Sequence, residues 1–327
     1  MIPYRPLIRN PHLQTIAAHF WKRPDSAAAF PIERRLYRTE PDVQVAVDWQ
    51  RPSGAIRAHV VMVHGLEGSS EAGYLRSLSA RALRAGCAPH RFHMRTCGGT
   101  EHLCTTLYHA GLTSDLASMV RQLHAENGAP IFLVGFSLGG NVVLKLAGEW
   151  KDDAGGLISG VCAVSTPLDL EACARRIDEP ENRAYRVRFV RRMRARLAAT
   201  GRYPAADLEG LDTIWQIDDR ITAPSFGFGH AENYYRTQSA KNFLEAIRVP
   251  TLLIQAKDDP LVPFRIFEQA PLGENPRIEL RVTEHGGHLG FLGRRPHRLW
   301  LDEALMQWIE PRIETASEPP VHADPHG

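Results

Sequence analysis

Short apolar runs along this chain alternate with longer segments whose apolar residues recur at helical spacing. Apolar runs of about four to eight residues are typical of buried strands, and recurrence every three or four residues is typical of helices. The alternation predicts a mostly parallel central sheet with helices on both faces, which is the α/β class. The predicted strands are an antiparallel pair, 32–37 and 43–49, and then 59–63, 88–94, 131–134, 157–164, 251–256 and 278–282. The predicted helices of this layered part are 72–84, 112–124, 140–150 and 297–309.

The regular alternation stops between about residues 167 and 247. This stretch has no strand-like run and contains an arginine-rich helical segment, 184–199, and an aromatic stretch that ends at Tyr235. We expect it to be a helical cap inserted into a single domain that spans residues 1–313. The last residues, 314–327, offer no apolar pattern to bury, so we expect them to form a disordered tail.

Composition limits the partners and the compartment. The chain has 327 residues, with 39 Lys and Arg against 37 Asp and Glu, and its net charge of +2 gives no long-range attraction to nucleic acid or to an anionic membrane. No apolar run approaches the roughly eighteen residues of a membrane span, and the N-terminal residues lack the apolar centre of a signal peptide. Five scattered cysteines make a disulfide framework unexpected. These features indicate a cytoplasmic protein, and a monomer or small homo-oligomer is the default expectation.

One motif carries most of the candidate chemistry. Gly135-Phe136-Ser137-Leu138-Gly139 lies between the predicted strand 131–134 and the predicted helix 140–150. A strand, a sharp turn and a helix are the setting of a nucleophilic serine, because the strained turn lifts the hydroxyl clear of the sheet. The small residues on either side let the strand and the helix approach closely. Ser137 is therefore the candidate nucleophile.

Two later segments supply candidate partners for Ser137. A serine hydroxyl needs a base, and the base needs a carboxylate to orient it. Asp258 and Asp259 follow the strand 251–256, and we favour Asp259 as the acid because a proline-bounded turn fixes it more tightly. His285 and His288 follow the strand 278–282 in a glycine-rich loop, and we favour His288 as the base. A metal site at the two histidines is not expected, since no further ligand stands at suitable spacing.

An acyl transfer also needs N–H donors for the oxyanion of the tetrahedral intermediate. The N–H of Leu138 follows the nucleophile and begins a helix. The second donor is expected from the turn after the strand 59–63, at Leu66. His64 in the same turn is expected to be a buried structural histidine that bonds to nearby backbone. This chemistry requires no cofactor.

Several longer motifs together resemble one branch of a known superfamily. They are Asn-Pro-His-Leu-Gln-Thr at 10–15, His-Gly-Leu-Glu-Gly-Ser-Ser at 64–70, Tyr-His-Ala-Gly at 108–111, Gly-Phe-Ser-Leu-Gly-Gly-Asn at 135–141 and Ala-Lys-Asp-Asp-Pro at 256–260. The chain resembles the YheT branch of the α/β-hydrolases over about residues 8–310. The resemblance implies an α/β-hydrolase sheet with a helical cap, a fixed structural N-terminal arm, and catalytic roles for Ser137, Asp259 and His288. One departure is Thr96, which stands where such proteins usually have glycine.

The favoured function is a serine hydrolase that cleaves carboxylic esters through an acyl-enzyme, with a small-molecule or lipid ester as substrate. The alternatives are an acyltransferase or a lipid-acting (phospho)lipase that uses the same three residues, and a non-catalytic binding protein that retains the fold. The arginines of 184–199 are expected to form a solvated face, and Cys97 is expected to serve packing. Whether Phe226, Phe228, Tyr234 and Tyr235 line an acyl pocket or pack the cap is left open.

Overall fold

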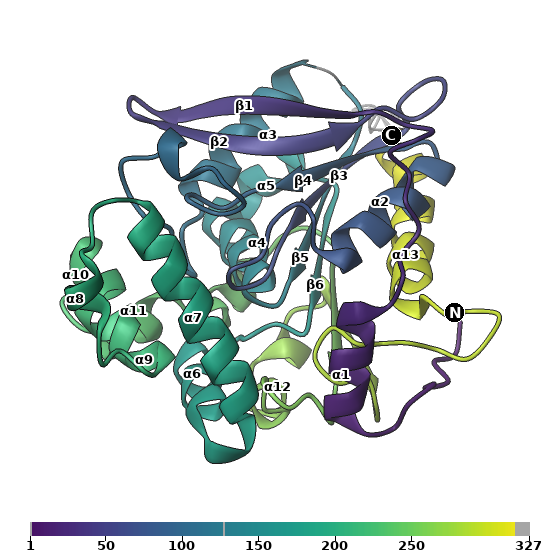
Figure 1. Cartoon of the computed structure of the whole chain (residues 1–327). Coiled ribbons are helices and arrows are strands. Elements are labelled where there is room, and N and C mark those ends of the chain that lie inside the picture. The colour runs from purple at the N-terminus through teal and green to yellow at the C-terminus, as the bar shows by residue number, and fades with distance from the viewer. Residues whose placement is uncertain (1, 127, 318–327) are drawn as a thin grey trace.

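A computed structural model describes residues 2–126 and 128–317 of the chain (Figure 1). One eight-stranded sheet crosses the molecule in the order β1-β2-β4-β3-β5-β6-β7-β8. The strands are β1 (Ile32–Glu40), β2 (Val43–Gln50), β3 (Ala58–Val63), β4 (Cys87–Phe92), β5 (Ile131–Phe136), β6 (Gly160–Val164), β7 (Thr251–Ala256) and β8 (Ile278–Thr283). β1 and β2 are antiparallel, β2 pairs antiparallel with β4, and every later pairing is parallel. The predicted fold class and all eight predicted strands are confirmed.

The central strands are apolar on both faces because helices cover both sides of the sheet. Several strand boundaries differ from the prediction by one to three residues. For example, β6 begins at Gly160 instead of 157, because α5 (Ala154–Leu157) occupies the preceding residues. The other helices around the sheet are α1 (Pro11–Phe20), α2 (Gly73–Arg84), α3 (Ser114–Glu126), α4 (Leu138–Trp150), α12 (Arg265–Glu268) and α13 (Trp300–Ser317). Short 3₁₀ turns are η1 (Glu101–Leu103), η2 (Lys151–Asp153) and η6 (Leu272–Glu274).

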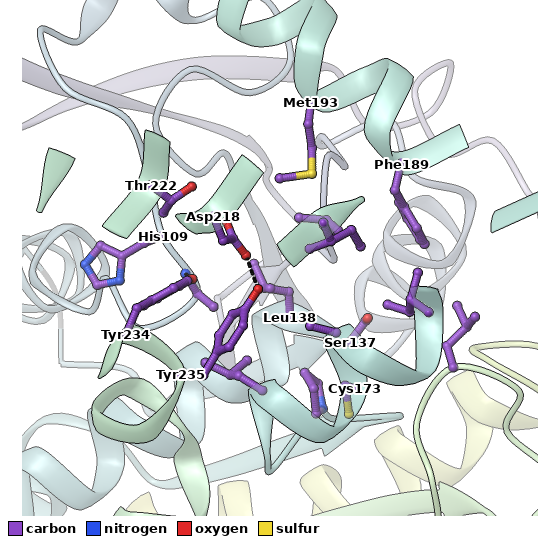
Figure 2. Close-up of a pocket in the computed structure, with 18 of the residues that line it drawn as sticks. His109, Ser137, Leu138, Cys173, Phe189, Met193, Asp218, Thr222, Tyr234 and Tyr235 are labelled. Atoms are coloured by element: carbon purple, nitrogen blue, oxygen red, sulfur yellow. Dashed lines mark hydrogen bonds between the residues drawn. The ribbon is translucent and has the colours of Figure 1, made fainter. Parts of the chain in front are cut away.

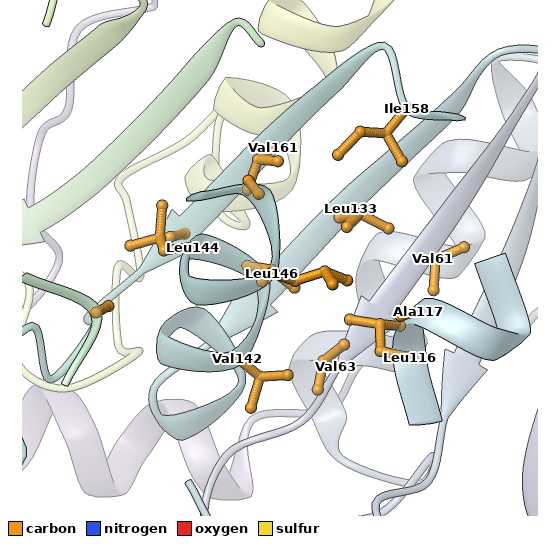
Figure 3. Close-up of a cluster of buried hydrophobic side chains, with 14 of the residues drawn as sticks. Val61, Val63, Leu116, Ala117, Leu133, Val142, Leu144, Leu146, Ile158 and Val161 are labelled. Atoms are coloured by element: carbon orange, nitrogen blue, oxygen red, sulfur yellow. The ribbon is translucent and has the colours of Figure 1, made fainter. Parts of the chain in front are cut away.

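Each face of the sheet has its own apolar core. On one face, strand residues such as Val61 and Leu133 pack against α3 and α4, whose Leu116 and Leu146 point toward them (Figure 3). On the other face, β3, β5, β6 and β7 pack against α2 and α13. These two layers fix the ends of β5, β7 and β8, from which the candidate site residues extend.

Residues 167–247 form a helical layer over one end of the sheet (Figure 1). Its helices are α6 (Leu170–Asp178), η3 (Pro180–Asn182), α7 (Arg183–Ala199), α8 (Ala205–Leu208), α9 (Ile214–Ile217), the π-helical turn η4 (Asp218–Thr222), α10 (Ala223–Ser225), α11 (Ala231–Gln238) and η5 (Ala240–Ala246). A third apolar cluster joins most of these helices and includes Val190, Met193 and Leu197 of α7. These three residues form the buried side of the arginine-rich helix.

The C-terminal helix is longer than the sequence predicts. α13 continues to Ser317, so residues 314–317, assigned to the tail from the sequence, are helical. Ile313 is buried in the core beneath α13 and anchors this last turn. The rest of the predicted tail, 318–327, lies outside the described residues.

Candidate active site

Ser137 occupies the sharp turn between β5 and α4. Its backbone has φ 52° and ψ −121°, in the left-handed half of φ space that residues with a side chain rarely adopt. The close approach of strand and helix explains the glycines on either side. A Cβ at Gly135 would stand 2.3 Å from the carbonyl oxygen of Gly139, and a Cβ at Gly139 would stand 2.3 Å from that of Val63. The sequence motif thus forms the strained turn that it predicts.

His288 and Asp259 both extend toward Ser137 from the carboxyl ends of neighbouring strands. The His288 Nε2 lies 2.9 Å from the Ser137 Oγ, and the His288 Nδ1 lies 3.0 Å from the Asp259 Oδ2. The Asp259 side chain is fully buried and that of His288 is nearly so. The structure therefore brings these three side chains, 151 and 29 positions apart in sequence, into one hydrogen-bonded chain.

The structure also separates the two neighbouring aspartates. The Asp259 Oδ1 accepts hydrogen bonds from the N–H groups of Leu261 and Val262, at 2.9 and 3.0 Å, which fixes its carboxylate under His288. The Asp258 carboxylate points elsewhere: it accepts the Gly287 N–H at 2.9 Å and lies 3.1 Å from the His285 Nδ1. Each histidine of the loop thus has its own carboxylate.

Leu66 and Leu138, the expected oxyanion donors, both line the cavity that contains Ser137. Leu138 is the first residue of α4, so its N–H is among the four that have no intrahelical acceptor. His64 is fully buried beside them, with its Nδ1 2.8 Å from the carbonyl oxygen of Gly65 and its Nε2 accepting the Met94 N–H at 3.2 Å. Burial lowers the pKa of His64 to about 3, so this imidazole is neutral and structural, as expected.

The N-terminal helix α1 reaches the site through Thr15, a residue of the motif at 10–15 for which the sequence indicated no role in the site. The Thr15 Oγ1 accepts the His288 N–H at 2.8 Å and donates to the Pro11 carbonyl at 2.7 Å. Gln14, buried beside it, donates to the Leu292 carbonyl at 3.0 Å. These hydrogen bonds hold the N-terminal arm in place, and the bond from His288 to Thr15 also holds the loop that carries His288. Thr15 and His288 are 273 positions apart, so no local pattern links them.

An apolar cavity extends from Ser137 into the cap (Figure 2). Its volume is ≈ 80 Å³. Phe189 and Met193 of α7 form part of its wall, and so do Tyr234 and Tyr235. The sequence left open whether the aromatic residues of the cap line a pocket or only pack. Tyr234 and Tyr235 line the cavity.

Phe226 and Phe228 serve packing instead. Their rings lie edge-on to the ring of His109, with centroids 4.5 and 5.3 Å away. Burial lowers the pKa of His109 to about 3, so this contact is made by a neutral ring.

A buried carboxyl group, which the sequence gave no reason to select, lies against the cavity. Asp218 faces it from η4, and its Oδ2 accepts the hydroxyl of Tyr235 at 2.7 Å (Figure 2). Burial raises the pKa of Asp218 to about 6, and the hydrogen bonds from Tyr235 and Thr222 oppose this rise. The cavity wall is thus mostly apolar, and Asp218 is one of its few polar groups.

One arginine of α7 contradicts the expectation of a wholly solvated arginine face. The Arg196 side chain is only 9% exposed, and its Nε lies 2.8 Å from the Oε1 of Glu67, whose side chain is 4% exposed. The Arg196 guanidinium also donates to the Thr96 Oγ1 at 3.0 Å and stacks on the ring of Tyr108. Arg196 is buried because the Glu67 carboxylate, from the turn after β3 and 129 positions away, meets it where the cap contacts the sheet.

The contact with Arg196 also accounts for the threonine at position 96, where similar proteins usually have glycine. Thr96 has φ 60°, the conformation for which glycine is usual, so the replacement keeps the loop geometry at the cost of strain. Its hydroxyl gains the hydrogen bond from Arg196. Cys97, the next residue, is buried and its pKa is raised by that burial, in keeping with a packing role.

Comparison with known proteins identifies the fold as a familiar one. The model of the alpha/beta hydrolase family matches residues 60–300. The chain belongs to this family. Within it, the chain is 33% identical to the Escherichia coli (strain K12) protein "Putative esterase YheT", with 94% of this chain and 92% of that protein aligned. It is 24% identical to phospholipase ABHD3 of Mus musculus over 90% of this chain and 76% of that protein.

A solved structure supports the same architecture. The esterase Pf2001 of Pyrococcus furiosus superposes with a TM-score of 0.57 at 19% identity, covering 90% of this chain and 99% of that one. At this identity the likeness concerns the fold alone. Across residues 2–126 and 128–317, no helix has both the length and the apolar character needed to cross a bilayer.

Proposed function

We propose that this protein is a serine hydrolase that cleaves carboxylic esters, with Ser137 as nucleophile, His288 as base and Asp259 as the residue that orients the base. The observation that carries the proposal is the continuous chain from the Ser137 Oγ to the His288 Nε2, at 2.9 Å, and from the His288 Nδ1 to Asp259, at 3.0 Å. Both distances lie within the range needed for proton transfer and orientation. Membership in the alpha/beta hydrolase family supports the same assignment.

In the proposed reaction, the Ser137 Oγ attacks the ester carbonyl carbon while the His288 Nε2 takes the hydroxyl proton. Asp259 accepts a hydrogen bond from the Nδ1–H and stabilises the imidazolium that forms. The N–H groups of Leu66 and Leu138 hold the oxyanion of the tetrahedral intermediate. When the intermediate collapses, His288 donates its proton to the departing alcohol, which leaves an acyl group on Ser137. Water, activated by the same imidazole, then releases the acid and restores the serine.

The cavity indicates which part of the substrate the site accepts. Its apolar wall fits an acyl chain or a similarly narrow apolar group. The names of the relatives, an esterase and a phospholipase, suit an ester of a small molecule or of a lipid. We therefore propose short and medium acyl esters as the substrates to test first.

The test compares wild type with Ser137→Ala on p-nitrophenyl esters of rising chain length. Loss of hydrolysis and of fluorophosphonate labelling in Ser137→Ala is expected, whereas equal turnover by the variant would refute the proposal. Failure of folded wild type to react with the fluorophosphonate would favour a non-catalytic protein. Product analysis with an added alcohol separates hydrolysis from acyl transfer.

A matched pair of variants tests which aspartate orients His288. Asp259→Asn is expected to lower kcat by about 10⁴, as loss of this group does in other serine hydrolases. Asp258→Asn, which alters the neighbouring carboxylate that bonds Gly287 and His285, is expected to retain most of the activity. The reverse ranking would contradict the assignment.

A further inference from the structure

One face of the N-terminal helix α1 exposes large apolar side chains. Leu13, Ile16 and Phe20 are 58%, 46% and 75% exposed. They stand at positions i, i+3 and i+7, so they form one stripe along the helix. The opposite side of α1 is the one that packs on the protein, where Gln14 and Ala18 are buried. The stripe is therefore an outward face of a helix whose other face is fixed.

The arginine-rich helix α7 lies beside α1 (Figure 1). The ring of His12 stacks on Tyr185 with centroids 5.7 Å apart, and the Arg188 guanidinium lies 3.0 Å from the His19 Nε2. Val187 of α7, itself 55% exposed, adds to the apolar surface. Four arginines of α7 are exposed around it. They are Arg183, Arg188, Arg191 and Arg192.

The charge of these two helices differs sharply from that of the whole chain. Residues 2–24 contain four basic residues and no carboxylate, and residues 183–199 contain seven arginines and no carboxylate. The net charge of the whole chain is only +2, so the near-balance of the composition hides a strongly basic local surface. We call the apolar residues Leu13, Ile16, Phe20 and Val187, together with the four exposed arginines of α7, the α1–α7 surface.

The α1–α7 surface borders the candidate active site. Thr15, on α1, holds the backbone of His288, and Phe189 and Met193, on α7, line the cavity. If another surface binds against α1 and α7, a molecule released from that surface has a short path to Ser137.

We propose that the α1–α7 surface docks on an anionic phospholipid membrane. A helix that lies in a bilayer interface presents an apolar stripe flanked by Lys or Arg, which is the pattern of these two helices. Each arginine near an anionic surface strengthens binding about fivefold, the equivalent of ~1 kcal/mol. Docking of this kind is peripheral and needs no membrane-spanning helix.

A second copy of this chain is a poorer occupant. A twofold interface places the same patch against itself, so the arginines of one α7 would face those of the other with no carboxylate between them. A membrane rich in anionic lipid supplies both the apolar interior for Phe20 and the negative charge for the arginines. The charge complementarity thus favours lipid over self-association.

The experiment is co-sedimentation of the full chain with two kinds of vesicle, phosphatidylcholine alone and phosphatidylcholine mixed with phosphatidylglycerol. Binding is expected only to the mixed vesicles, and raising the salt from about 0.05 M to about 0.5 M should weaken it because exposed charges are screened. Ile16→Ser with Phe20→Ser should weaken binding about tenfold. Arg188→Gln with Arg192→Gln should weaken it about tenfold or more.

Matched controls change exposed apolar residues and exposed arginines elsewhere. Ile32→Ser with Leu36→Ser on β1, and Arg51→Gln with Arg277→Gln, should bind as wild type does. Ser137→Ala should also bind normally, so that failure of docking and failure of the proposed chemistry are told apart. Equal binding to both vesicles, equal loss in the control variants, or no vesicle binding with concentration-dependent dimerisation would overturn the proposal.

Discussion

The buried pair between Arg196 and Glu67 gives the sharpest prediction about how the cap is held on the sheet domain. Replacing Arg196 by methionine keeps most of its volume but leaves the Glu67 carboxylate buried with only the hydroxyl of Tyr108, 3.2 Å away, as a side-chain partner. Removing one partner of a buried ion pair costs about 3–5 kcal/mol, because the other charge is left uncompensated. For a chain of this size we expect a fall in Tm of roughly 5–10 °C.

A double-mutant cycle with urea unfolding checks the reason as well as the size. Glu67→Gln combined with Arg196→Met should recover at least half of the loss, since no charge then remains buried. Arg194→Met on the same helix is the matched control. Arg194 pairs with Asp212 at 3.2 Å with side chains 31% and 76% exposed, so its loss should cost less than about 1 kcal/mol.

Two outcomes would refute this reasoning. A cost for Arg196→Met no larger than that for Arg194→Met would mean that the buried pair contributes nothing beyond a surface pair. A double variant less stable than Arg196→Met alone would mean that the unpaired carboxylate is not the cause. Since Glu67 follows Leu66 in the candidate oxyanion turn, we also expect kcat on a short ester to fall with stability in Arg196→Met.

Three further predictions address the site, the pH dependence and the packing. Thr15→Val should lower kcat about tenfold with little change in KM, because the His288 N–H loses its acceptor. Thr15→Ser keeps the hydroxyl and should behave as wild type. Equal kcat values for the two variants would contradict a positioning role for Thr15. Burial raises the pKa of Asp302 to about 6, so this group favours the folded state below its unfolded pKa near 4 and loses that advantage as pH rises through 6. Asp302→Asn should therefore flatten the urea-unfolding free energy between about pH 4 and pH 6, by up to about 3 kcal/mol, and an unchanged slope would count against it. Gly139→Ala should cost at least about 2 kcal/mol in the same assay, because its Cβ would meet the Val63 carbonyl oxygen at 2.3 Å, whereas Gly155→Ala, which meets nothing, should be nearly neutral.

The layered architecture and the position of the candidate nucleophile, Ser137, follow from patterns within the sequence. Short apolar runs rich in β-branched residues fit the inner strands of a covered sheet, and this pattern is local, so each run predicts its own strand. The glycine at 135 reflects a contact within a few residues, between β5 and the first turn of α4. The acid and base segments could be found because both directly follow a strand, and the carboxyl ends of parallel strands meet at one edge of a sheet.

Which side chains meet at this edge of the sheet depends on the tertiary structure. Asp258 and Asp259 are neighbours with similar local surroundings, and the direction of the chain leaving β7 turns one toward His285 and the other toward His288. The support of His288 by Thr15, and the burial of Arg196 against Glu67, join residues 273 and 129 positions apart.

The α1–α7 surface likewise exists only in the folded chain. Neither helix alone combines the two features, because α1 carries the exposed apolar stripe and α7 carries the cluster of arginines. The stripe and the arginines become one surface only because folding places α1 beside α7. The physical reason is that hydrophobic periodicity and turn chemistry act over a few residues, whereas the pairing of charges and the sharing of a surface depend on distances that exist only after the chain has folded.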